Sequence, residues 1–123
     1  MATWNTGPFD NDEAQELLED LRSGLLDPVE LIPNTGYRRI DADEGQIVVA
    51  LAALATSEED DLPDGISPDI VAPLREPTVK ERLRQNLEAI VADAQVSDLF
   101  AWWQTHHPDK VLEWKAASWV SLG

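Results

Sequence analysis

The chain has 123 residues, 43% of them hydrophobic and none of them cysteine, which predicts one folded domain over residues 1–123 without disulfides, thiolate zinc sites or a cysteine nucleophile. Its 24 acidic and 9 basic residues give a formal net charge of -15, which disfavours binding to nucleic acids and to anionic membranes, because both are recognised through basic surfaces. The chain shows no signal-peptide pattern and no apolar run of the roughly 20 residues that span a bilayer, so we expect a cytoplasmic protein.

The first predicted helix covers residues 12–23. Asp10 and Glu13 have the spacing of a capping box, and Phe9 stands at the apolar position before this cap. Gly24 is a typical residue to end the helix. The apolar residues of this segment recur at helical spacing among acids, as on an amphipathic helix: Leu17, Leu18 and Leu21.

Two more helices are predicted before residue 57. Asp27, followed by proline, favours a short helix over residues 28–32. The aliphatic run over residues 47–55 permits either a buried strand or a buried helix. Its length, its alanines and the capping pair Asp41 and Glu44 favour a helix over residues 42–56.

The second half of the chain predicts further helices. A solvated loop is expected over residues 57–65. The helices predicted after it are a short one from Ser67 to Pro73, a long one over residues 78–94, and two that are separated by Pro108. The predicted fold is therefore all-α, a compact bundle of about five or six helices with a carboxy-terminal helical hairpin.

Two carboxylate clusters, Asp10 with Asp12 and Asp41 with Asp43, stand at predicted helix starts. Capping and the helix dipole explain acids at these positions without any ligand, and we favour this interpretation. The alternative is a divalent cation held by carboxylate oxygens, in a metal-dependent enzyme or a small-ligand binder.

Other motifs of catalysis are absent from the sequence. It contains no glycine-rich phosphate loop, no serine elbow and no HExxH pair, which disfavours an enzyme, and no cofactor is predicted. Gly36 and Tyr37 with Arg38 and Arg39 are an alternative anion site, although these arginines also have acids nearby to pair with.

Four of the five tryptophans lie in the predicted carboxy-terminal hairpin. At helical spacing such residues belong mostly to the core. We expect at least one of them, Trp103 or Trp119, to be exposed and available to a partner or to a second copy in a homo-oligomer.

The chain opens with Trp4-Asn5-Thr6-Gly7-Pro8-Phe9-Asp10-Asn11-Asp12. This phrase resembles the opening of the domain of unknown function 4259 family, small bacterial proteins that typically begin with Trp-Gly-x-Gly-x-Phe-Asp-Asn-Asp. Asn5 stands where glycine is usual. The resemblance implies one compact domain and names no activity, since the family has none established. It marks the matching residues as the best candidates for a shared fold or site: Trp4, Gly7, Phe9, Asp10, Asn11 and Asp12.

The acidity is concentrated in the first half of the chain. Residues 1–64 carry 16 acids and 3 bases, whereas residues 65–123 carry 8 acids and 6 bases. The leading hypothesis is a non-enzymatic interaction domain, similar to an immunity or antitoxin protein, whose acidic half binds a basic protein partner. The alternatives are a merely solubilising surface, the cation-dependent protein described above, and a structural homo-oligomer.

Overall fold

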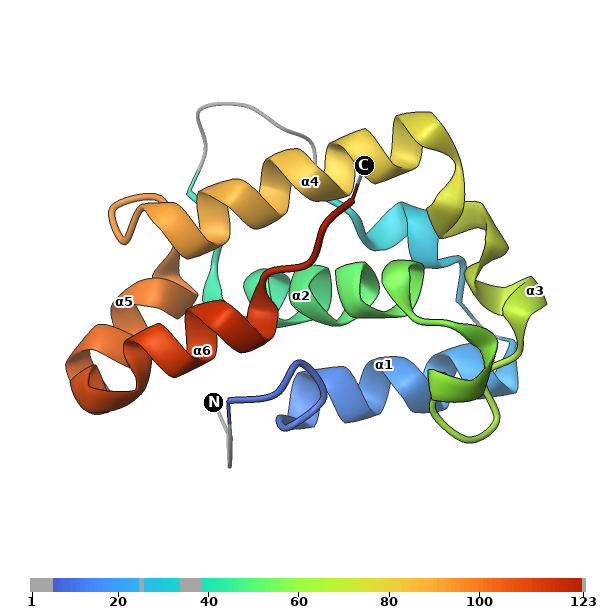
Figure 1. Ribbon diagram of the computed structural model, residues 1–123, viewed down its shortest axis with the longest axis horizontal. Coiled ribbons are helices and arrows are strands. Elements are labelled where there is room, and N and C mark those ends of the chain that lie inside the picture. Colours follow the sequence, from blue (N-terminus) through green and yellow to red (C-terminus); the bar gives the residue numbers. More distant parts are fainter. Residues whose placement is uncertain (1–5, 25, 34–38, 123) are drawn as a thin grey trace.

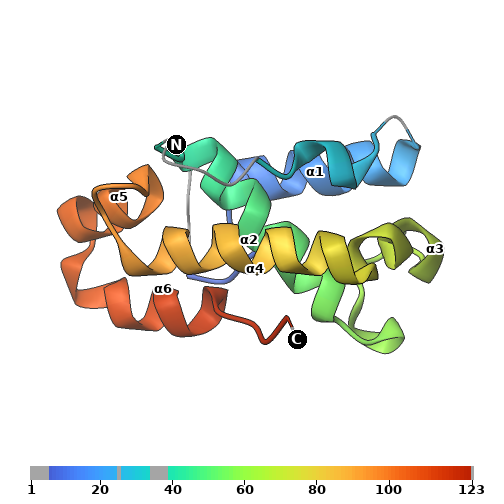
Figure 2. The ribbon, with the colours of Figure 1, turned by 90° about the horizontal axis from the view of Figure 1, so that it is seen from above.

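The computed structural model describes residues 6–24, 26–33 and 39–122. Helix α2 (Ala42–Thr56) lies at the centre, between α1 (Asp12–Ser23) on one side and α4 (Pro77–Ala92) on the other (Figure 1). Helices α1 and α2 run in the same direction and α4 runs in the opposite one, as Figure 2 also shows from above. Helices α5 (Asp98–His106) and α6 (Val111–Ser118) form a hairpin at the end of the bundle where α2 begins. The shorter elements are η1 (Pro28–Leu31), η2 (Glu59–Asp61), α3 (Pro68–Val71), η3 (Ala72–Arg75) and η4 (Pro108–Lys110).

The predicted all-α bundle with a carboxy-terminal hairpin is confirmed. The described residues form six α-helices and no strand. Helices α1 and α2 have the predicted bounds. Helix α4 ends at Ala92 instead of residue 94, because Asp93 takes an extended conformation and its side chain accepts a hydrogen bond from the Gln95 backbone N–H at 2.8 Å. The predicted loop over 57–65 is also more ordered than expected, since it contains η2.

Helix α2 is the core of the molecule. It is apolar on nearly every side because it contacts α1, α4 and α5 as well as η1 and η3. Its small residues allow close packing: a Cβ atom on Gly45 would lie 3.1 Å from the Leu99 Cβ of α5. The residues buried along α2 after Gly45 and Gln46 are Val48, Val49, Ala50, Leu51, Ala52, Ala53, Leu54 and Ala55. No helix in the described ranges is both long and apolar enough to cross a membrane.

The starts of α2 and α5 are held side by side by the backbone. The Ile40 N–H donates to the Val96 carbonyl at 2.8 Å, and the Asp98 N–H donates to the Ile40 carbonyl at 3.0 Å. Ser97 is buried and its hydroxyl oxygen caps α5 by accepting from the Phe100 N–H at 3.2 Å. The hairpin is therefore anchored next to the first turn of α2.

Two polar side chains of α4 hold η1 against the bundle. Asn86 is buried, and its amide donates to the Pro33 carbonyl at 3.0 Å. Arg82 donates to the Ile32 carbonyl, also at 3.0 Å. These bonds satisfy backbone carbonyls that would otherwise be covered without a partner. They fix the position of η1 beside α1 and α2.

The aromatic residues of the hairpin form a small core of their own. The Trp114 ring stacks on Trp103, with centroids 6.1 Å apart, and meets the Phe100 ring edge-on at 5.8 Å. Trp103 is only 3% exposed, so the expectation that it is available to a partner is wrong. Its side chain packs against Trp114 of α6, which covers it. Trp119 is 45% exposed, as expected for at least one tryptophan.

Candidate functional site

The segment before α1 folds into a tight turn. The Asp10 backbone N–H donates to the Gly7 carbonyl at 3.2 Å, and the Gly7 N–H donates to Asp10 Oδ2 at 3.1 Å. A Cβ atom on Gly7 would collide with Asp10 Oδ2, so a larger residue here would displace that carboxylate from its hydrogen bond with the Gly7 N–H. Trp4, the first residue of the family-like phrase, lies outside the described residues.

Asn11 caps α1. Its Oδ1 accepts a hydrogen bond from the Ala14 backbone N–H at 2.8 Å, and the residue is 1% exposed. The predicted capping box of Asp10 and Glu13 is therefore wrong by one residue, because the Asp10 side chain is engaged with Gly7 instead. Because Asn11 is the cap, Asp10 occupies the position directly before it, and Phe9 lies one residue earlier than predicted. Phe9 is partly buried against the core.

Most of the family-like phrase thus has a structural role in the described residues. Gly7 and Asp10 form the turn, Asn11 caps the helix, and the Phe9 carbonyl accepts a hydrogen bond from the Gln15 side chain at 2.9 Å. Asp12 is the one exposed residue in the range 6–12. It is therefore the member of this segment that is best placed to meet another molecule.

The structure brings Asp12 of the first predicted carboxylate cluster, together with Glu13, near Asp41 and Asp43 of the second at the parallel starts of α1 and α2, whereas Asp10 is bound to Gly7. Partial burial raises the pKa of Glu13, and the negative charges of neighbouring carboxylates raise it further. These neighbours are, in decreasing order of effect, Asp43, Glu16, Asp12 and Asp41. We call Asp12, Glu13, Glu16, Asp41 and Asp43 the acidic cluster.

The acidic cluster has no counter-charge from the described part of the chain. None of its five carboxylates forms an ion pair there. The two arginines described in the first half are engaged elsewhere: Arg22 donates to the Asp64 carbonyl at 2.6 Å, and Arg39 pairs with Asp98. Because Arg39 pairs with Asp98, these contacts do not place it in the alternative anion site suggested by the sequence. The other residues of that suggestion, Gly36, Tyr37 and Arg38, lie outside the described residues.

Acids on α4 have a different environment. Hydrogen bonds from Arg84 and then Gln85 lower the pKa of Glu81 to about 2, and the partnership with Glu81 raises the pKa of Arg84 in turn. Arg84 also pairs with Glu88 at 2.6 Å. The carboxylates of α4 are therefore compensated locally, whereas those of the acidic cluster repel one another.

The alternative of a divalent cation gains no support from this geometry. Asp41 Oδ1 accepts from the Glu44 backbone N–H at 2.8 Å, so it serves as the cap of α2, and Asp10 is held by Gly7. Across residues 6–24, 26–33 and 39–122, no group of three or more histidine, aspartate or glutamate side chains is arranged to hold a metal.

A groove lies beside the acidic cluster, between α1, η1 and α2. It has a volume of about 190 Å³. Acids of α1 form one rim, and aliphatic side chains form the rest: the buried Leu17 of α1 and three half-buried residues, one from the segment before η1, one from η1 and one from α2. We call it the acidic groove; its lining residues are Glu13, Glu16, Leu17, Asp20, Leu26, Leu31 and Ile47. A surface that combines carboxylates with apolar side chains is suited to bind an amphipathic cationic group.

Comparison with protein families supports the resemblance of the chain to a known family. The model described as Domain of unknown function (DUF4259) matches residues 2–117. The chain belongs to the DUF4259 family. No curated protein and no solved structure was found to match it. The family description names no activity for this DUF4259 chain.

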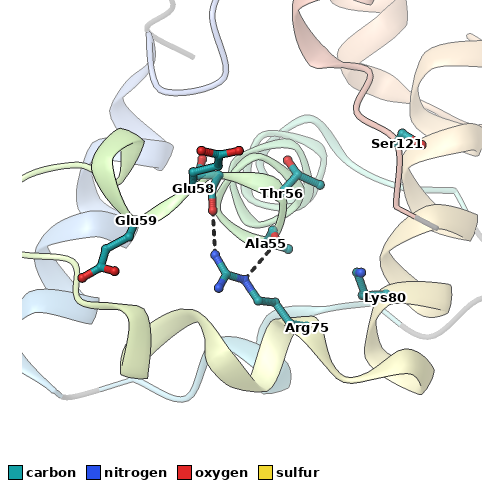
Figure 3. A pocket seen from close by; sticks show the side chains of 8 residues that line it. Ala55, Thr56, Glu58, Glu59, Arg75, Lys80 and Ser121 are labelled. Carbon is teal, nitrogen blue, oxygen red and sulfur yellow. Dashed lines mark hydrogen bonds between the residues drawn. The ribbon is translucent and has the colours of Figure 1, made fainter.

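A second hollow of the DUF4259 chain, of about 410 Å³, lies at the opposite end of α2 (Figure 3). Arg75 reaches across it and donates to the Ser57 carbonyl at 2.6 Å and to the Ala55 carbonyl at 3.3 Å. Arg75 thereby satisfies carbonyls at the end of α2, which complements the negative end of the helix dipole. Lys80 and Ser121 line the other side. The arginine has a structural role, and the other charged residues that line this hollow are Glu58, Glu59 and Lys80.

The acidic groove is not predicted by the sequence patterns of the chain. Glu13, Glu16 and Asp20 recur at helical spacing on one edge of α1, and this spacing was the available signal. Leu31 and Ile47 could not be assigned to the same site, because they come from different elements whose packing depends on the contacts of α4 with η1.

Replacing Glu13 with glutamine is expected to stabilise the protein at neutral pH. The helix dipole favours an acid in the first turn, but burial and repulsion from neighbouring carboxylates raise the pKa of Glu13, and we expect these two effects to outweigh that benefit. The gain is less than about 1 kcal/mol, since Glu13 is largely hydrated. A raised folded-state pKa means that ionised Glu13 opposes folding above that pKa, so the advantage of the variant disappears as the pH falls through the ordinary glutamate value of 4.5.

Urea denaturation at neutral and acidic pH measures this difference, with Glu19→Gln as the control of equal charge on the same helix. A Glu13→Gln variant that is less stable than the wild type at neutral pH would show that the dipole dominates instead.

Proposed function

We propose that this chain is a non-enzymatic interaction domain that acts in the cytoplasm and binds a basic protein partner through the acidic cluster and the acidic groove, as an immunity or antitoxin-like protein would. The main support is the absence of any counter-charge for the acidic cluster within the described residues. Close carboxylates that repel one another are stabilised when a cation binds among them, so a basic surface gains electrostatic energy there.

The distribution of charge favours an interaction surface over a surface that only keeps the protein soluble. A surface that only confers solubility has no need for clustering, yet the acids from two separate segments converge where α1 and α2 begin. Two helix starts explain some of these acids, since Asp41 caps α2. Capping does not account for Glu16 or for Asp20, which lie beyond the first turn and line the groove.

Retention of a basic protein on the immobilised chain tests the proposal. We expect a partner from native lysate to bind at about 0.1 M salt and to be released at about 1 M salt, where the screening length falls from about 10 Å to 3 Å. The variant Glu13→Gln/Glu16→Gln/Asp43→Asn should lose this partner. The control Glu58→Gln/Glu59→Gln/Asp60→Asn removes equal charge from exposed residues at η2 and should keep the partner.

The comparison between these two variants decides the outcome. Equal loss of binding in both variants would mean that net charge alone attracts the protein, and the proposed site would be wrong. The same conclusion follows if the retained proteins are not basic or if their retention does not depend on salt.

A further inference from the structure

We propose that the acidic groove accepts one large apolar side chain from the partner, and that lysine or arginine residues on both sides of it pair with the carboxylates of the rim. This inference rests on the proposed function and specifies the kind of segment that the site recognises: a basic and amphipathic one. Its basis is the juxtaposition of four aliphatic side chains, which we call the floor, with three carboxylates of α1, which we call the rim, in one hollow.

The floor of the groove is apolar and accessible. Leu26, Leu31 and Ile47 are only partly buried, although each packs against the core. Leu17 also lines the groove and is nearly covered, with 3% exposure. A hydrophobic side chain placed here would bury these aliphatic surfaces further, and the removal of apolar area from water is favourable.

The rim matches a segment with several positive charges. Glu13, Glu16 and Asp20 are spaced by three and four residues on α1, so they lie on one edge of the helix. From Glu13 to Asp20 this edge extends about 10 Å along the helix axis, at a rise of 1.5 Å per residue. Asp43 adds another carboxylate next to Glu13. Basic residues on either side of a buried anchor can therefore each reach an acid.

The size and charge of the groove decide between occupants. A volume of about 190 Å³ is below the roughly 300–1,000 Å³ of most small-molecule sites, which favours a single side chain over a cofactor. Anionic ligands are repelled by the rim. A second copy of this chain is disfavoured by its net charge of -15. The apolar floor supplies no ligands for a metal ion.

Two synthetic peptides test the inference. One carries a single leucine between pairs of lysines, and the other carries serine in place of that leucine. We expect the leucine peptide to bind the wild-type chain about tenfold more tightly in titration calorimetry, because burial of the larger apolar side chain contributes at least this factor. Backbone amide signals around the groove should shift in NMR spectra of the complex.

Matched variants separate the floor from the rim. Leu31→Gln keeps the charge and should abolish the preference for leucine without changing the salt dependence. Glu16→Gln/Asp20→Asn should weaken the binding of both peptides and reduce the salt dependence. Leu112→Gln alters a side chain that is 80% exposed on α6, and it should change neither the preference for leucine nor the salt dependence. Thermal melts check that each variant is folded. If Leu31→Gln does not fold, Ile47→Thr replaces it as the variant of the apolar floor.

The outcomes distinguish the inference from the proposed function. Equal binding of both peptides that weakens only in the rim variant would overturn the apolar anchor and leave the acidic interaction site in place. No binding of either peptide, or binding with signal shifts away from the groove, would also overturn the inference. The lysate experiment then still decides the proposed function by itself.

Discussion

Replacing Trp114 with alanine is expected to lower the free energy of unfolding by about 3–5 kcal/mol, as large-to-small changes of buried aromatic residues do. Trp114 is 2% exposed and joins the rings of Trp103 and Phe100. The change leaves a cavity between α5 and α6 and removes both ring contacts. Because domains of this size have only about 5–15 kcal/mol of stability, the hairpin is expected to loosen at moderate denaturant concentrations.

Guanidinium denaturation of Trp114→Ala measures this effect, and Trp119→Ala is the control with the same change of residue type. Trp119 is 45% exposed, so its removal should cost much less. If Trp114→Ala does not fold, Trp114→Phe retains part of the ring contacts and should give an intermediate midpoint. Equal midpoints for the two alanine variants would contradict the packing of the hairpin described above.

Replacing Asn11 with alanine is expected to cost about 1–2 kcal/mol, the upper range for loss of a helix cap. The Ala14 N–H would lose its acceptor in a place that is closed to water, and a buried donor without a partner is costly. Hydrogen exchange should become faster in the first turn of α1 before it changes elsewhere.

The variant Asn11→Ser is the control for this prediction, since serine also provides a cap acceptor. It should retain most of the stability lost in Asn11→Ala. If both variants are destabilised equally, the volume of the asparagine matters more than its hydrogen bond, and the capping role would need to be abandoned.

The helices of the first half could be predicted from the sequence because their boundaries are local. Asp41 caps α2 and Gly24 ends α1 with a positive φ of 73°, so these signals act within a few residues. The cap of α1 was misplaced because Asp10 and Asn11 are both good capping residues. Only the contact of Asp10 with Gly7 shows which of them is free to cap.

Features that depend on distant contacts could not be predicted in the same way. Trp103 and Trp119 both belong to the predicted hairpin, but Trp103 stacks on Trp114 of α6, whereas Trp119 follows the end of that helix. Asn86 lies on the apolar stripe of α4 as a polar residue, and its burial follows from a carbonyl more than 50 residues away. The acidic groove likewise requires η1 to be placed beside α1 and α2.

The position of α2 at the centre of the bundle has a consequence for the chain before it is folded. A helix that is apolar on almost every side would associate with other copies if left uncovered, and α4, which covers one side of it, follows only later in the chain. Residues 1–64 contain α2 and also 16 of the 24 acids. Repulsion between such chains opposes aggregation while α2 is exposed, because charges beside a hydrophobic segment act as gatekeepers. The acidity of the first half therefore protects the unfolded protein as well as shaping the surface of the folded one.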